Sequence, residues 1–128
     1  MERYKLTTQF WRGRHGRTYT AVDVQEGAEV TISFMNEELG DQEIAASAAL
    51  KVVPNVLQLK DSFTVQSRMG TKKALVYESV KRSYLVSSVM STLSSTMTEV
   101  SVSYILQQLL STLIEVHAMG IVHCDIRA

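Results

Sequence analysis

The fold class follows from residues 5–35, KLTTQFWRGRHGRTYTAVDVQEGAEVTISFM, in which apolar and polar residues alternate and β-branched and aromatic residues are frequent. This pattern is typical of strands that are buried on one side. We predict strands at residues 5–11, 17–24 and 28–35, with turns at Gly13, Gly16 and Glu26-Gly27. Because the turns are short and a parallel crossover needs roughly a dozen residues, the strands are expected to be antiparallel.

The next segment predicts a helix and two more strands. Asn36 can cap the helix, and Glu37 and Glu38 follow in the first turn, where the helix dipole favours acidic residues. Apolar residues recur at three- and four-residue spacing until Pro54, which ends the helix. Strand-like runs at 56–66 and 73–80, joined by a turn at Gly70, complete an α+β fold of five antiparallel strands and one helix.

The remaining residues predict a linker and two helices. Residues 81–98 are rich in serine and threonine, and a helical period at 85–93 predicts a short helix there. Residues 96–99, TMTE, fit a capping box that begins at Thr96. A long helix ending at Gly120 should follow, with one apolar face formed by Val102, Ile105, Leu106, Leu109, Leu110, Leu113 and His117.

Composition excludes several classes of function. Thirteen basic and thirteen acidic residues give no net charge, which argues against a nucleic-acid or membrane-surface partner. The single cysteine, Cys124, excludes an internal disulfide and a multi-cysteine zinc site. The three histidines lack metal-ligand spacing, so no metal site is predicted. With no apparent signal peptide or transmembrane segment, we expect an intracellular, cytoplasmic protein.

Residues 109–128, LLSTLIEVHAMGIVHCDIRA, resemble the run LLxGLxYLHxxGIVHRDLKP of eukaryotic serine/threonine-type protein kinases. The match places His123-Cys124-Asp125 at the family's His-Arg-Asp motif. The resemblance implies that Asp125 orients the proton of the substrate hydroxyl and that Arg127 keeps a positive charge near the transferred phosphate. Cys124 replaces an arginine that, in the family, commonly contacts the phosphorylated activation loop.

The resemblance divides the chain into a kinase-like N-lobe, residues 1–80, and a partial C-lobe, residues 81–128, with the hinge, two helices and the start of the catalytic loop. Residues 75–80, LVYESV, resemble the strand that enters the hinge. On this alignment Tyr77 is the gatekeeper, and the backbone of Glu78 and Val80 is expected to face adenine.

Residues 11–16, WRGRHG, align with the family's glycine-rich loop GxGxxG, whose backbone lies close to the phosphates. Gly13 and Gly16 are present, Trp11 replaces the first glycine, and Thr18 replaces the valine that usually covers adenine. An ordinary hairpin turn would explain the two glycines equally well.

Residues 30–33, VTIS, occupy the position of the family's VAIK motif, with Thr31 for alanine and Ser33 for the phosphate-binding lysine. The glutamate that partners this lysine corresponds to Glu43, although Ile44 could occupy the same helical column. Serine cannot supply a charged contact worth roughly 1.5–3 kcal/mol, or about one to two orders of magnitude in binding. No catalytic-loop asparagine or Asp-Phe-Gly motif follows, so we expect Mg²⁺ ligands to be absent and ATP binding to be compromised.

Three functional hypotheses follow. The first is a truncated, degenerate kinase-like domain without independent phosphotransferase activity, which binds another protein through the exposed face of its long helix. The second is an ATP-binding part of a serine/threonine kinase in which Arg12, Arg14 and Arg17 replace the lost lysine. The third is a nucleic-acid module that uses residues 13–16, GRHG, as the GxxG loop of KH domains do. That loop joins two helices, whereas its flanks here predict strands.

Overall fold

The computed structural model describes residues 2–13, 16–68, 70–79, 98–124 and 126 of the 128-residue chain. Its contacts group the chain into two compact units, which are described separately below. The first contains residues 1–51 and 57–80, and the second contains residues 52–56 and 81–128.

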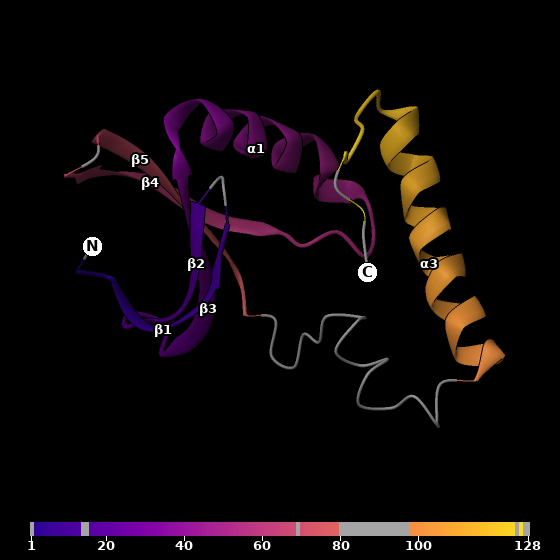
Figure 1. Cartoon of the computed structure of the whole chain (residues 1–128), viewed down its shortest axis with the longest axis horizontal. Coiled ribbons are helices and arrows are strands. Elements are labelled where there is room, and N and C mark those ends of the chain that lie inside the picture. Colours follow the sequence, from indigo (N-terminus) through magenta and orange to yellow (C-terminus); the bar gives the residue numbers. More distant parts are fainter. Residues whose placement is uncertain (1, 14–15, 69, 80–97, 125, 127–128) are drawn as a thin grey trace. The chain divides into compact units, whose positions relative to one another are not determined.

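The first unit is an antiparallel five-stranded sheet with the strand order β1-β2-β3-β5-β4 (Figure 1). A helix, α1 (Glu37–Ala49), follows the third strand, and a short 3₁₀ turn, η1 (Leu50–Val52), extends it. The strands are β1 (Tyr4–Arg12), β2 (Gly16–Asp23), β3 (Ala28–Asn36), β4 (Leu59–Ser67) and β5 (Gly70–Glu78). The predicted α+β architecture, five antiparallel strands with one helix, is therefore confirmed.

The β4–β5 hairpin is tighter than the sequence predicted. Ser67 and Gly70 face each other in the ladder, and the Ser67 hydroxyl donates a 2.6 Å hydrogen bond to the Gly70 carbonyl. Gly70 has a φ of 100°, a left-handed conformation that a residue with a side chain rarely adopts. This turn allows β5 to begin at Gly70, three residues before the predicted start at residue 73.

Side chains alternate between two faces of the sheet, and one face carries the main hydrophobic cluster. We call it the core face. Its buried members come from four strands and are Tyr4, Ala21, Val30, Ile32, Ala74 and Val76, against which Phe34, Phe63 and Val65 pack. The opposite face, which we call the helix face, carries Thr31, Ser33 and Met35 of β3.

Contacts to α1 define the helix face. A Cβ on Gly40 would collide with the side chain of Lys73, so the helix approaches β5 closely at this residue. Lys73 also forms a 3.0 Å ion pair with Asp41. As predicted, Asn36 caps the helix, because its Oδ1 accepts a 2.8 Å hydrogen bond from the Leu39 amide.

The two edge strands, β1 and β4, are joined by side chains across the core face. The Tyr4 hydroxyl donates a 2.7 Å hydrogen bond to Asp61, and its ring stacks on Phe63 at 5.6 Å. Burial and then the hydrogen bond to Asp61 raise the pKa of Tyr4 to about 12, so the phenol stays a donor over the neutral range. The sheet is therefore curled, because β1 and β4 are not neighbours in the strand order.

The buried carboxylate of Asp23 connects Arg3, which precedes β1, to the β2–β3 turn. Asp23 is 2% exposed and accepts hydrogen bonds of 2.6 to 3.1 Å from the Arg3 guanidinium. It also accepts bonds from the amides of Gln25 and Glu26. The Arg3 contact, followed by those amides, holds the pKa of Asp23 below its ordinary value of 3.8.

The second unit contains one long helix, α3 (Glu99–Ala118). The predicted N-cap at Thr96 is wrong, because Thr98 has extended backbone and its hydroxyl accepts the Ser101 amide at 3.2 Å. Glu99 is then the first helical residue and is too early to close a capping box with Thr98. Gly120, with a φ of 74°, follows the helix as predicted.

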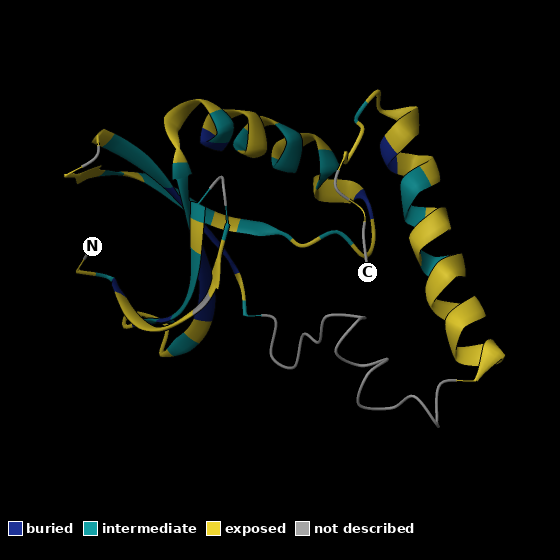
Figure 2. Cartoon of the chain, in the orientation of Figure 1, coloured by how far each residue is buried: buried dark blue, intermediate teal, exposed yellow. Residues whose placement is uncertain are grey.

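Most of α3 is exposed (Figure 2). Val116 is buried, as is Val53 of the same unit, and Thr112 donates a long 3.4 Å hydrogen bond to the Pro54 carbonyl. His117, predicted to lie on the apolar face, is exposed. No helix among the described residues combines the length and apolar character needed to cross a bilayer. The predicted short helix at 85–93 lies outside the described residues.

Acid should destabilise the first unit through Asp23. Its depressed pKa contributes stability that is fully present above the ordinary value of 3.8 and is lost as the pH falls through the lower folded-state value. We therefore expect Asp23→Asn to reduce the free energy of unfolding more at pH 7 than at pH 3. Urea unfolding of both proteins at the two pH values would measure this difference. Glu2→Gln, at an exposed carboxylate, is the control, and an equal loss at both pH values would contradict the prediction.

Candidate functional site

The candidate nucleotide-site residues of β3, Thr31 and Ser33, lie on the helix face, two residues apart on one strand. Thr31 is buried and pairs with Tyr77 of β5. Ser33 is half-buried and pairs with Leu75. The sheet register therefore brings three of the predicted residues, Thr31, Ser33 and Tyr77, to one surface.

Ser33 is paired with a neutral partner. Thr18 lies directly opposite it on β2, and the two hydroxyl oxygens are 3.0 Å apart. Each hydroxyl can donate or accept, so the pair satisfies itself without a charge. At the position that the sequence aligned with a phosphate-binding lysine, this chain therefore has a neutral hydrogen bond within the sheet.

The carboxylate of Glu43 is also engaged with the sheet. It accepts a 3.1 Å hydrogen bond from the hydroxyl of Tyr77. Of the two candidates in the helical column, it is Glu43 whose side chain reaches the residues of the helix face, while Ile44 is a half-buried apolar residue of the same helix. Burial and the neighbouring Glu43 carboxylate raise the pKa of Tyr77 well above its ordinary value of 10.0. The phenol therefore remains protonated and keeps donating to Glu43.

Of the two glycines in the β1–β2 connection, Gly16 is required by local packing. The Gly13 amide donates a 3.0 Å hydrogen bond to the Gly16 carbonyl. A Cβ on Gly16 would collide with the backbone carbonyl of Phe34, and one on Gly13 would collide with the indole of Trp11. Trp11 pairs with Thr18, so its side chain is on the helix face beside Thr18 and Ser33. The indole thus lies against Gly13 of the loop.

Arg17 lies on the opposite face of the sheet. It pairs with Phe34, a core-face residue, whereas its neighbour Thr18 pairs with Ser33. Arg12 pairs with Arg17 and shares its face. The prediction that these two arginines replace the lost lysine is therefore not supported by the register, because the sheet separates them from Ser33. Arg14 lies outside the described residues.

The remaining predicted site residues lie at the end of a strand or outside the described residues. Glu78 is exposed at the end of β5 and pairs with Val30. Val80, Asp125 and Arg127 lie outside the described residues, so their predicted roles stay predictions. Among the residues that are described, no group of three or more histidine, cysteine or acidic side chains could hold a metal ion.

Comparison with known proteins gives a distant relation to a kinase. No protein-family model matches the chain. A probable serine/threonine-protein kinase of Dictyostelium discoideum is 25% identical to it over 130 residues, an alignment that covers 99% of this chain. The same alignment covers 20% of that protein, so the chain spans about one fifth of the length of this relative. The chain is therefore distantly related to part of a probable serine/threonine kinase.

Two cations that flank the β4–β5 turn, Arg68 and Lys72, were not predicted as site residues from the sequence. Both line a cleft on the core face, together with Arg17. The available signal was the run RMGTKK at residues 68–73, in which three cations surround a turn glycine. The run alone could not predict which of these cations line the cleft. The strand register decides this, because it places Lys72 opposite Val65 on the core face and Lys73 toward α1.

Removing the Tyr77 hydroxyl should loosen α1 from the sheet. Tyr77→Phe deletes the donor to Glu43 and leaves a carboxylate that water can reach, so we expect a loss of about 0.5–1.5 kcal/mol in the free energy of unfolding. Chemical denaturation at pH 7 would measure it. Tyr19→Phe is the matched control, because the ring of Tyr19 packs edge-on against Phe34 at 5.7 Å and the phenylalanine keeps that contact. Equal stabilities of Tyr77→Phe and wild type would show that the hydrogen bond does not hold the helix.

Proposed function

We propose that this chain is a degenerate protein-kinase-like domain that acts as a binding module rather than as an independent phosphotransferase. The distant relation to a probable serine/threonine kinase and the five-stranded sheet with one packed helix support the kinase-like part. The observation that carries the functional part is the Thr18–Ser33 hydroxyl pair, which stands where the family has its phosphate-binding lysine.

Two further contacts weaken the helix face as a nucleotide site. The Glu43 carboxylate, which in the family would pair with the lysine, is bound to Tyr77. The Trp11 indole lies against Gly13, where a triphosphate would need the loop backbone to come close. Without the lysine, a charged contact worth roughly 1.5–3 kcal/mol is missing, which corresponds to about one to two orders of magnitude in affinity.

As the partner surface we propose the exposed apolar side of α3, which would contact another protein. Its members are large apolar residues at helical spacing, with exposed fractions of 37% to 58%, and they are Ile105, Leu106, Leu109 and Leu110. Exposed apolar surface of this kind marks interaction sites in soluble proteins. Leu113, which the sequence placed in the same group, is half-buried.

The alternative function, an ATP-binding part of a serine/threonine kinase, rests on the relation to the Dictyostelium protein. The nucleic-acid alternative lacks its structural basis, because Gly13 and Gly16 stand at the ends of two strands, β1 and β2, instead of between two helices.

Titration with ATP and Mg²⁺ tests the proposal. Trp11 is the single tryptophan of the sequence and lies on the helix face, so its fluorescence reports on this face. We expect no change up to millimolar ATP, and no phosphotransfer above that of an Asp125→Ser control. Saturable quenching with a micromolar dissociation constant, or turnover above the control, would establish the alternative instead.

A gain-of-function variant tests whether the helix face corresponds to the kinase nucleotide face. Ser33→Lys restores the missing charge, and Tyr77→Phe added to it frees Glu43 to pair with the new lysine. We expect the double variant to bind ATP at least tenfold more tightly than wild type, which is about 1.4 kcal/mol. Ser33→Gln with Tyr77→Phe is the uncharged control. No gain, or the same gain in the control, would reject the kinase-like assignment of this face.

A further inference from the structure

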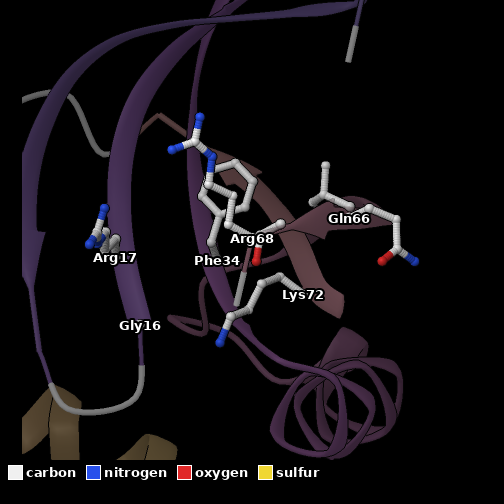
Figure 3. Close-up of a pocket in the computed structure, with 8 residues that line it drawn as sticks. Gly16, Arg17, Phe34, Gln66, Arg68 and Lys72 are labelled. Carbon is white, nitrogen blue, oxygen red and sulfur yellow. The ribbon is translucent and has the colours of Figure 1, made fainter. Parts of the chain in front are cut away.

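A cleft of about 340 Å³ lies on the core face, at the end of the sheet that carries the β4–β5 turn (Figure 3). Four strands contribute to it, because the core-face positions of β2, β3, β4 and β5 meet there. It is lined by Gly16, Arg17, Phe34, Val65, Gln66, Ser67, Arg68 and Lys72. Its volume is within the range of roughly 300–1,000 Å³ that is usual for small-molecule sites.

The lining combines an apolar centre with a cationic rim. Phe34 and Val65 are half-buried and belong to the residues that pack against the core cluster. Figure 3 shows the side chains of Arg17, Arg68 and Lys72 around Phe34. No lining residue is acidic.

These three cations have no acidic partner within the part of the chain that the structure describes. Other cations of the first unit do have one, since Arg3 pairs with Asp23 and Lys73 pairs with Asp41. Arg12 adds to the imbalance, because it lies directly opposite Arg17 and like charges at such a position repel. In a chain with no net charge, this cleft is thus a local concentration of uncompensated positive charge.

We propose that this cleft binds an organic phosphate monoester. The phosphate would contact Arg17, Arg68 and Lys72, and an aromatic or other apolar group on the ester would lie on Phe34 and Val65. A phosphate dianion suits the rim because each guanidinium offers a planar fork of donors to its oxygens. A monocarboxylate carries half the charge, and an inorganic phosphate leaves the apolar centre uncovered.

The proposed site is independent of the nucleotide question. Arg17 and Phe34 are on the core face, whereas Ser33 and Thr18 are on the helix face. Binding at the cleft therefore predicts nothing about the fluorescence of Trp11 and survives if the kinase-like assignment fails. The fluorescence of Trp11 reports on the helix face, where Trp11 pairs with Thr18. Binding of a ligand in the cleft is measured separately, by calorimetry.

Isothermal titration of the full chain with phenyl phosphate tests the proposal. We expect one site with a dissociation constant on the order of 0.1–1 mM, which is typical for a ligand of this size. Inorganic phosphate should bind at least fivefold more weakly, and phenol should not bind. Absence of phenyl phosphate binding at 5 mM, or equal affinity for phenyl phosphate and inorganic phosphate, would overturn the proposal.

Charge-removing variants locate the site. Arg17→Gln, Arg68→Gln and Lys72→Gln should each weaken binding of phenyl phosphate about threefold to tenfold, and Arg68→Gln with Lys72→Gln should abolish it. The exposed or half-buried position of these side chains leaves the core intact, which circular dichroism would verify. Lys51→Gln, which removes one exposed charge outside the cleft, is the matched control and should bind as wild type does. An equal loss in Lys51→Gln would show that only net charge matters and would reject the site.

Titration with a phosphopeptide distinguishes a modified protein from a small phosphate ester as the natural ligand. A short peptide with one phosphotyrosine carries the same aryl phosphate as phenyl phosphate. Tighter binding of this peptide than of phenyl phosphate, with no binding of its unphosphorylated form, would assign the cleft to a modified protein. Weaker binding of the peptide than of phenyl phosphate would assign it to a small phosphate ester, and failure of both ligands would reject the proposal.

Discussion

The two-residue alternation of side chains along β3 is the constraint on which the rest of the first unit depends. Val30, Ile32 and Phe34 fill the core, while Thr31, Ser33 and Met35 face α1. A single strand therefore contributes to both the hydrophobic interior and the candidate nucleotide surface. A shift of the register by one residue would exchange the two sets, so the burial of Ile32 fixes the position of Ser33 as well.

Hydrogen bonds of hydroxyl groups connect the elements of the helix face. Thr18 with Ser33 and Tyr77 with Glu43 connect β2 to β3 and β5 to α1. Such pairs satisfy the buried or half-buried hydroxyls and avoid the cost of desolvating an ammonium group. The same contacts that stabilise the helix face also engage the Glu43 carboxylate, which accepts the hydrogen bond of Tyr77.

The sheet, α1 and its cap at Asn36 could be predicted from the sequence because each depends on local pattern and short turns. The errors occurred where sequence spacing was not enough. The capping box was placed at Thr96 because Glu99 follows it by three residues, whereas the helix begins after the extended backbone of Thr98. The proposed role of Arg12 and Arg17 assumed that nearness in sequence means nearness in space. Pairing of Arg17 with Phe34 places both arginines across the sheet from Ser33.

The β1–β2 connection shows why a glycine pattern alone is weak support for phosphate binding. Gly16 is needed because the Phe34 carbonyl leaves no room for a Cβ, and the Trp11 indole lies where a Cβ of Gly13 would be. Both contacts exist without any ligand. The residue after Gly16 then faces the cationic cleft, and the one after that faces Ser33. One hairpin therefore serves two surfaces of different character. An anion at this hairpin would meet Arg12 and Arg17 on the core face and the hydroxyls of Thr18 and Ser33 on the helix face.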